Sequence, residues 1–105
     1  MKNLLVVINP ISGRLSKKNV MSTIDSHIDR KKYDVTIRFT KYAGHAAILA
    51  DDAVKSGVDV VVAVGGDGTV NEVAKALVHT NTALGIIPCG SGNGLARHLH
   101  IPLNI

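Results

Sequence analysis

Apolar residues fall into four short runs along the chain, and helix-type patterns separate these runs. The runs at residues 3–9 and 58–64 are almost continuously apolar, as buried strands should be, and the run at 3–9 is typical of a strand covered on both faces of a sheet. Residues 33–40 instead alternate Val35, Ile37 and Phe39 with polar neighbours, which predicts a half-buried strand at a sheet edge. With the run at residues 83–88, the pattern therefore predicts four strands.

Helices are predicted between these strands, at residues 16–30, 44–56 and 69–79, with a short helical segment at 95–99. In the first helix, Val20, Met21, Ile24 and Ile28 recur at helical spacing, and Gly57 is the expected C-cap of the second. Strands that alternate with helices predict an α/β domain, in which helices cover both faces of a parallel sheet. Right-handed crossovers favour the spatial strand order 2-1-3-4.

This strand order predicts where a ligand binds. Open α/β sheets bind ligands at the carboxyl ends of the strands, where the order reverses, and here that point lies between the first and third strands. Three loops would meet there, at residues 9–13, 65–69 and 90–93, with Thr40 ending the second strand beside them. The glycine-rich segments of the chain would therefore gather on one edge of the sheet.

The most informative of these loops is Gly65-Gly66-Asp67-Gly68-Thr69, between the third strand and the third helix. Glycines let backbone N–H groups approach an anion closely, and the free amides and dipole of the helix add to the attraction. The expected ligand is a phosphate, although the same residues would also serve as a plain tight turn. The loop has neither the lysine of a Walker motif nor the G-x-G-x-x-G spacing of a dinucleotide-binding turn.

The acidic residue of this loop admits three interpretations. Asp67 would repel a phosphate unless a Mg²⁺ ion, held directly or through water, lay between them. It would alternatively bond a ribose hydroxyl or cap the helix at Thr69. In the next turn, Asn71 is a candidate donor to a phosphate or to a neighbouring loop, and Glu72 would favour the helix dipole.

Composition narrows the classes of partner. The chain has 105 residues, of which 46% are hydrophobic and 19% charged, and this composition predicts one globular domain. Its net charge of +4 suits an anionic ligand and equally suits an ordinary basic surface. Aromatic residues make up only 3%, which argues against a nucleic-acid stacking surface. The single cysteine, Cys89, excludes an internal disulfide and favours an intracellular setting. The apolar run near Met1 is too short for a signal peptide or a membrane span, and the apolar final residues suggest a chain that stops within a longer protein.

Five further side chains are weaker candidates. Arg97 would either neutralise a transferred phosphate or lie on a helix surface. His45 precedes a helix and is expected to cap or pack. His98 and His100 do not share a helix face, so they do not predict a metal site. Cys89 adjoins a glycine loop without a base that would activate it, so it is expected to pack.

Four motifs, taken in order, resemble a known family. They are Asn9-Pro10-Ile11-Ser12-Gly13, Thr40 before Gly44-His45-Ala46, residues 65–73 with the sequence GGDGTVNEV, and Gly90-Ser91-Gly92-Asn93 with Leu95-Ala96-Arg97. Together they resemble the catalytic domain of the diacylglycerol kinase and sphingosine kinase superfamily, especially its bacterial soluble members. The resemblance spans the chain and implies a three-layer, Rossmann-like fold similar to that of phosphofructokinases and NAD kinases.

The resemblance also implies an ATP site. Gly65, Gly66, Asp67, Gly68, Thr69, Val70 and Asn71 would line it, with Asn9, Thr40 and Ser91 contacting the nucleotide from the other loops. Many bacterial diacylglycerol kinases have Asp where this chain has Gly94, whereas sphingosine and ceramide kinase relatives carry a small residue there, so the lipid is left open. Family members continue into a β-rich domain that supplies much of the lipid site and the proposed general base.

The sequence as a whole therefore predicts the N-terminal, ATP-binding domain of a lipid kinase. It would use Mg²⁺ held by Asp67 and transfer the γ-phosphate of ATP to a diacylglycerol- or sphingosine-type hydroxyl, with little activity in the 105 residues alone. The expected setting is cytoplasmic, with peripheral contact to the inner face of the membrane, no nucleic-acid partner, and homodimerisation left open. The alternatives are a kinase of a soluble substrate, similar to NAD kinase, and a nucleotide-binding module without catalysis.

Overall fold

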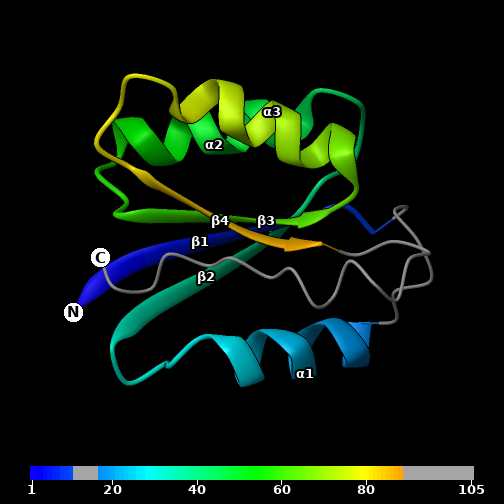
Figure 1. The fold of residues 1–105 in the computed structure, drawn as a ribbon, viewed down its shortest axis with the longest axis vertical. Helices are drawn as coiled ribbons and strands as arrows, with labels where there is room; N and C mark the ends of the chain where they lie inside the picture. Colours follow the sequence, from blue (N-terminus) through cyan, green and yellow to red (C-terminus); the bar gives the residue numbers. More distant parts are fainter. Residues whose placement is uncertain (11–16, 89–105) are drawn as a thin grey trace.

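The computed structural model describes residues 1–10 and 17–88 and shows a parallel sheet between two layers of helices (Figure 1). The strands are β1 (Lys2–Ile8), β2 (Tyr33–Phe39), β3 (Val60–Gly65) and β4 (Ala83–Pro88), and the helices are α1 (Lys17–His27), α2 (His45–Lys55) and α3 (Asp67–Leu77). The sheet order is β2-β1-β3-β4 with every neighbouring pair parallel, which confirms the predicted order. Helix α1 covers one face of the sheet, and α2 and α3 cover the other (Figure 1). The helical segment predicted at 95–99 lies outside the described residues.

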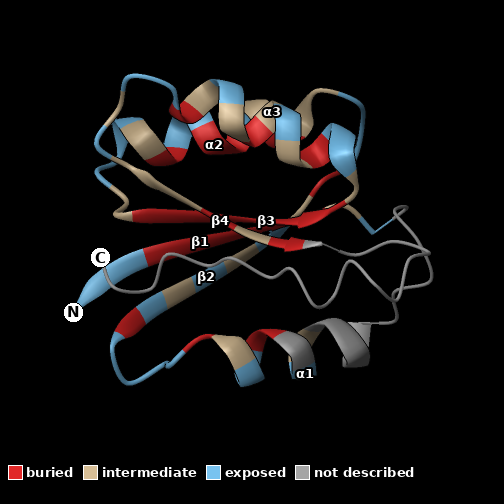
Figure 2. Ribbon diagram, viewed as in Figure 1, coloured by how far each residue is buried: buried red, intermediate tan, exposed pale blue. Residues whose placement is uncertain are grey.

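The core consists of two layers, one on each face of the sheet. Successive side chains of a strand point to opposite faces, so alternate residues of β1 enter different layers. Leu4, Val6 and Ile8 pack in the layer that also holds Ile24 of α1, whereas Leu5 and Val7 pack in the layer of α2 and α3. The unbroken apolar runs of β1 and β3 are therefore explained by burial on both faces, and Figure 2 shows both strands as mostly buried.

Strand β2 forms one edge of the sheet, as its alternating pattern predicts. Asp34, Thr36 and Arg38 are exposed, while the intervening Val35, Ile37 and Phe39 are half-buried against the layer beneath α1. The alternation arises because only one face of this strand is covered by a helix.

The C-cap of helix α2 lies one residue before the predicted one. Ser56 is the C-cap, and Gly57 follows it with φ of 81° in the left-handed region. The amide of Gly57 donates to the carbonyl of Val54 over 3.1 Å, and that of Val58 donates to the carbonyl of Ala53 over 3.0 Å. These two bonds form a Schellman motif, in which a glycine after the cap lets the chain reverse. The glycine therefore ends the helix as expected, although it lies just beyond the cap.

Candidate functional site

The candidate site lies at the carboxyl ends of β1, β2 and β3. Asn9 follows β1 and donates its backbone amide to the carbonyl of Val64 over 3.1 Å, and Thr40 follows β2 and donates its amide to the carbonyl of Ile8 over 2.8 Å. The hydrogen bonding between β1 and β3, and that between β1 and β2, thus each continue one residue beyond the strand ends. Asn9 and Thr40 are consequently held at the same edge of the sheet as the glycine turn, where the strand order predicts a ligand.

Helix α3 begins inside the predicted glycine loop, at Asp67 rather than at Thr69. Gly66 is the N-cap, and the first helical hydrogen bond joins the amide of Val70 to the carbonyl of Gly66 over 3.1 Å. The interpretation of Asp67 as the helix cap is therefore wrong, because Asp67 is already the first residue of the helix. Since Gly66 has no side chain, the N-cap residue itself supplies no side-chain hydrogen bond to this helix end. The N-terminal end of a helix is a favourable position for an anion, and here it lies at the same edge of the sheet as Asn9 and Thr40.

The first turn of α3 is packed closely against the strand ends. The side-chain amide of Asn9 donates to Oγ1 of Thr69 over 3.3 Å, and Thr69 is only 5% exposed. Gly65 lies beneath this contact, where a Cβ atom would stand 2.9 Å from Oγ1 and 3.0 Å from Cβ of Thr69. A glycine at position 65 therefore permits the helix to approach the strand so closely.

A pocket of about 220 Å³ opens beside this contact. Its polar or charged lining residues include Asn9, Thr40, Lys41, Thr69 and Glu72. The sequence predicted Asn9, Thr40 and Thr69 as ligand residues, and the structure brings them together. Tyr42, Ala43 and Ala46 complete the lining.

Sequence reasoning missed part of this lining. Lys41 and Tyr42 directly follow Thr40, so their position after a strand at the ligand edge was the available signal. Glu72 was interpreted only as a partner of the helix dipole, yet it lies one turn into α3 on the side that lines the pocket. The available signal for Glu72 was its position on the side of the helix that faces the ends of the strands.

The remaining predicted site residues do not belong to the pocket lining given above. Val70 is half-buried and packs against the layer of α2 and α3, whereas Asn71 is exposed. Asp67 is exposed in the first turn of α3. Within the described part of the chain, no three His, Cys, Asp or Glu side chains gather closely enough to hold a metal ion by themselves. Several other candidates lie outside the described residues, namely Ser91, Cys89, Arg97, His98 and His100.

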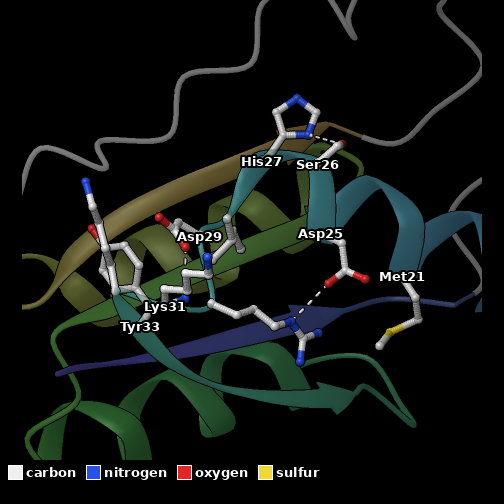
Figure 3. A pocket seen from close by; sticks show the side chains of 10 residues that line it. Met21, Asp25, Ser26, His27, Asp29, Lys31 and Tyr33 are labelled. Atoms are coloured by element: carbon white, nitrogen blue, oxygen red, sulfur yellow. Dashed lines mark hydrogen bonds and ion pairs between the residues drawn. The ribbon is translucent and has the colours of Figure 1, made fainter.

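A larger hollow, of about 860 Å³, lies at the end of α1 and the start of β2, away from the carboxyl ends of the strands (Figure 3). Two of its carboxylates are engaged within the wall, since Asp25 Oδ1 accepts a hydrogen bond from Arg30 Nε over 3.0 Å and Asp29 accepts the backbone amide of Lys31 over 2.9 Å. This hollow has no link to the glycine turn, so the smaller pocket is the candidate site.

Comparisons with known proteins identify the family of this chain. The family model of the diacylglycerol kinase catalytic domain matches residues 3–105. The curated diacylglycerol kinase of Bacillus subtilis is 36% identical over 104 residues, which cover 97% of this chain and 34% of that protein. The diacylglycerol kinase of Staphylococcus haemolyticus is 34% identical over 102 residues, which cover 95% of this chain and 31% of that protein. The chain therefore spans about a third of the length of the curated relatives that it matches.

Solved structures show the same architecture. A crystal structure of a diacylglycerol kinase from Bacillus anthracis superposes with a TM-score of 0.70 at 29% identity, covering 99% of this chain and 39% of that one. A phosphate-loop protein solved in solution superposes with a TM-score of 0.62 at 20% identity, covering 92% of this chain and 84% of that one. The second likeness shows the α/β fold alone.

Proposed function

Because the chain belongs to the diacylglycerol kinase catalytic domain family, we propose that it carries the nucleotide-binding part of an ATP-dependent lipid kinase. The observation that carries this proposal is the first turn of α3. Its N-cap residue, Gly66, has no side chain that could cap the amides, and Asn9 and Thr40 lie at the ends of β1 and β2 on the same edge of the sheet. A polyphosphate placed there would receive several backbone N–H donors and the positive end of the helix dipole.

The reaction would transfer the γ-phosphoryl group of ATP to a lipid hydroxyl. The hydroxyl oxygen forms a bond to the γ-phosphorus, the bond from that phosphorus to the β–γ bridging oxygen breaks, ADP leaves, and a base takes the hydroxyl proton. Such transfers depend mainly on positioning and on neutralising charge. In this chain, the first turn of α3 would hold phosphates, and the pocket lined by Thr40 and Asn9 would hold another part of the nucleotide.

Asp67 fits the role of a Mg²⁺ residue. Mg²⁺ in nucleotide sites is usually held by one or two carboxylates together with phosphate oxygens and waters, so a complete protein cage is not required. Asp67 is exposed in the first turn of α3, beside the proposed phosphate position. When bound there, Mg²⁺ would neutralise charge on the phosphates, which would remove the repulsion between them and this carboxylate.

The lipid acceptor is proposed from the relatives, which are named as diacylglycerol kinases. We place the general base and most of the lipid site in a further, β-rich domain, because the chain spans only 31–34% of those relatives. Among residues 1–10 and 17–88, no helix has the length and apolar character of a membrane span. We therefore propose that lipid is reached by peripheral contact at the inner face of the membrane.

Two measurements test the proposal. Titration calorimetry of the chain with ATP is expected to show binding that strengthens when Mg²⁺ is present. In a second measurement, a form of the protein that includes the proposed further domain is incubated with labelled ATP and with diacylglycerol, sphingosine or NAD, and the label is expected on a lipid. An absence of ATP binding with Mg²⁺ would overturn the proposal. Transfer to NAD rather than to lipid would instead favour a kinase of a soluble substrate.

A further inference from the structure

The loop after β2, residues 41–44, forms one wall of the candidate pocket and is held by the first residue of α2. Nδ1 of His45 accepts the backbone N–H of Lys41 over 2.9 Å, and the amide of His45 donates to the carbonyl of Tyr42 over 3.1 Å. Gly44, the N-cap of α2, has φ of 90° and turns the chain back on itself. The loop is thus fixed by its own contacts before any ligand binds.

The same histidine supports an aromatic ring at the pocket. The rings of Tyr42 and His45 stack with their centroids 4.4 Å apart and their planes inclined by 14°. Tyr42 nevertheless remains 57% exposed, because His45 covers only one of its faces. Tyr42 also lines the pocket beside Thr40 and Thr69. The structure therefore presents a flat, exposed π surface next to the proposed phosphate position.

We propose that Tyr42 is the platform on which the base of the bound nucleotide stacks, and that His45 is the positioning residue that holds this platform in place. This inference rests on the proposed nucleotide-binding function and adds the subsite for the base. A planar base gains stacking energy on an aromatic face, and the gain does not depend on hydrogen bonds to a particular base. The platform should therefore favour nucleotides over inorganic polyphosphate without selecting adenine strongly.

The size of the pocket agrees with a ligand whose base lies in the pocket and whose phosphates lie outside it. Pockets that enclose a whole drug-sized ligand usually measure about 300–1,000 Å³. The pocket beside Tyr42 measures only about 220 Å³, so it suits the base and its sugar while the phosphates lie at the start of α3. Thr69 belongs both to the pocket lining and to the first turn of α3, so the two parts of the site are continuous.

Preorganisation explains the role of His45. Because Nδ1 accepts a hydrogen bond from Lys41, the neutral ring carries its proton on Nε2. Both contacts of this ring restrict the loop, so less conformational freedom is lost when a base stacks on Tyr42. A nitrogen-15 NMR measurement of the His45 ring is expected to show the Nε2–H tautomer, and the opposite tautomer would contradict the Lys41 contact.

The platform is tested by comparing two probes that both contain three linked phosphates, of which only one also carries a base. Calorimetry would measure the affinity of the chain for ATP and for inorganic tripolyphosphate, each with Mg²⁺. Tyr42→Ala is expected to weaken ATP binding about tenfold, from the usual energy of base stacking, and to leave tripolyphosphate unchanged. Tyr42→Phe keeps the ring and serves as the matched control, with ATP affinity expected within about twofold of the original. Equal losses for both probes, or no loss for ATP, would overturn the platform.

These measurements distinguish an error in the proposed base subsite from an error in the proposed nucleotide-binding function. If the original chain binds neither probe, the nucleotide site itself is wrong. If it binds both and Tyr42→Ala changes neither, only the base subsite is wrong. The sequence contains two tyrosines and no tryptophan, so tyrosine emission offers a second readout. ATP should alter this emission in the original chain but not in Tyr42→Phe, although both bind ATP.

The positioning role requires its own variants. His45→Ala removes both the acceptor for the Lys41 amide and the ring that stacks on Tyr42. It is expected to weaken ATP binding several-fold while tripolyphosphate binding stays unchanged. His45→Asn restores an acceptor for the Lys41 amide without the ring, so its ATP affinity should lie between those of the original chain and His45→Ala. Equal losses of affinity for both probes in His45→Ala would show that His45 supports the fold in general rather than the position of Tyr42.

Discussion

The side-chain amide of Asn9 donates to the hydroxyl of Thr69 over 3.3 Å and ties the end of β1 to the first turn of α3. These residues are 60 positions apart in the sequence, yet their contact sets where the helix begins relative to the sheet. Because the amides of this turn are the proposed phosphate donors, the bond also orients the functional site. Several predictions about variants depend on this arrangement.

Removing the hydroxyl of Thr69 should destabilise the fold modestly. Thr69→Val keeps the shape of a 5%-exposed side chain but leaves Asn9 without its acceptor, so the expected loss is about 1 kcal/mol. Thr69→Ser retains the hydroxyl and should lose less. Urea denaturation measures both, with the exposed Thr36→Val on β2 as a control expected within about 0.5 kcal/mol of the original. Equal stability of Thr69→Val and the original chain would contradict the role of this bond.

Two glycines of the same turn should respond oppositely to alanine. In Gly65→Ala the new Cβ would stand 2.9 Å from Oγ1 of the buried Thr69, so the helix must shift at an expected cost of about 1–3 kcal/mol. At Gly68 the new Cβ would meet no atom of residues 1–10 and 17–88 within 4 Å, apart from the adjoining backbone, and alanine favours the helix by up to about 1 kcal/mol. Thermal unfolding should therefore show a lower midpoint for Gly65→Ala and an unchanged or higher one for Gly68→Ala. Similar midpoints for the two would show that the close approach at Gly65 is unimportant.

Replacing Asp67 should change how ATP binding depends on magnesium. Asp67→Asn removes the carboxylate that would hold the ion, so affinity for ATP with Mg²⁺ is expected to fall about tenfold. Affinity for ATP without Mg²⁺ should rise, because the repulsion between carboxylate and phosphate is gone. Calorimetry in Mg²⁺ and in chelator checks both, and Asp52→Asn on the exposed side of α2 is the control. If magnesium strengthens binding equally in Asp67→Asn and the original, the ion is held elsewhere.

Packing of α1 can be tested with two isoleucines. Ile24 is 0% exposed in the core beneath α1, so Ile24→Ala should cost about 2–5 kcal/mol through lost burial and a cavity. Ile48 on α2 is 49% exposed, and Ile48→Ala should change stability by only about 0.5 kcal/mol. Urea midpoints of the two variants separate these expectations. A small effect of Ile24→Ala would mean that α1 contributes little to the core.

Much of the fold followed from local patterns in the sequence. The unbroken apolar runs of β1 and β3 indicate strands buried on both faces, and the alternation in β2 indicates an edge, because strand side chains change face at every residue. The handedness of the crossovers then leaves few arrangements, and the predicted order agrees with β2-β1-β3-β4. Asn9, Thr40 and the glycine turn were consequently predicted at one edge of the sheet.

The start of α3 was decided by tertiary contacts. Glycine has a low helix propensity, so the sequence placed Gly68 in a loop and began the helix at Thr69. In the structure, Thr69 docks against Asn9 and the later residues Val73 and Leu77 are buried. These contacts hold the first turn in helical form from Asp67 onward, because packing outweighs a propensity difference of about 1 kcal/mol.

The sequence by itself thus determined the strands, their order and the sheet edge at which we propose that a ligand binds. Only the tertiary structure decided which side chains share the pocket there, including the roles of Lys41, Tyr42 and Glu72 as lining residues and of His45 behind Tyr42. The physical reason is that hydrophobic periodicity is a local property that each segment displays alone. Contacts such as Asn9 with Thr69 join residues that are distant in the chain, and they exist only after the strands and helices have packed.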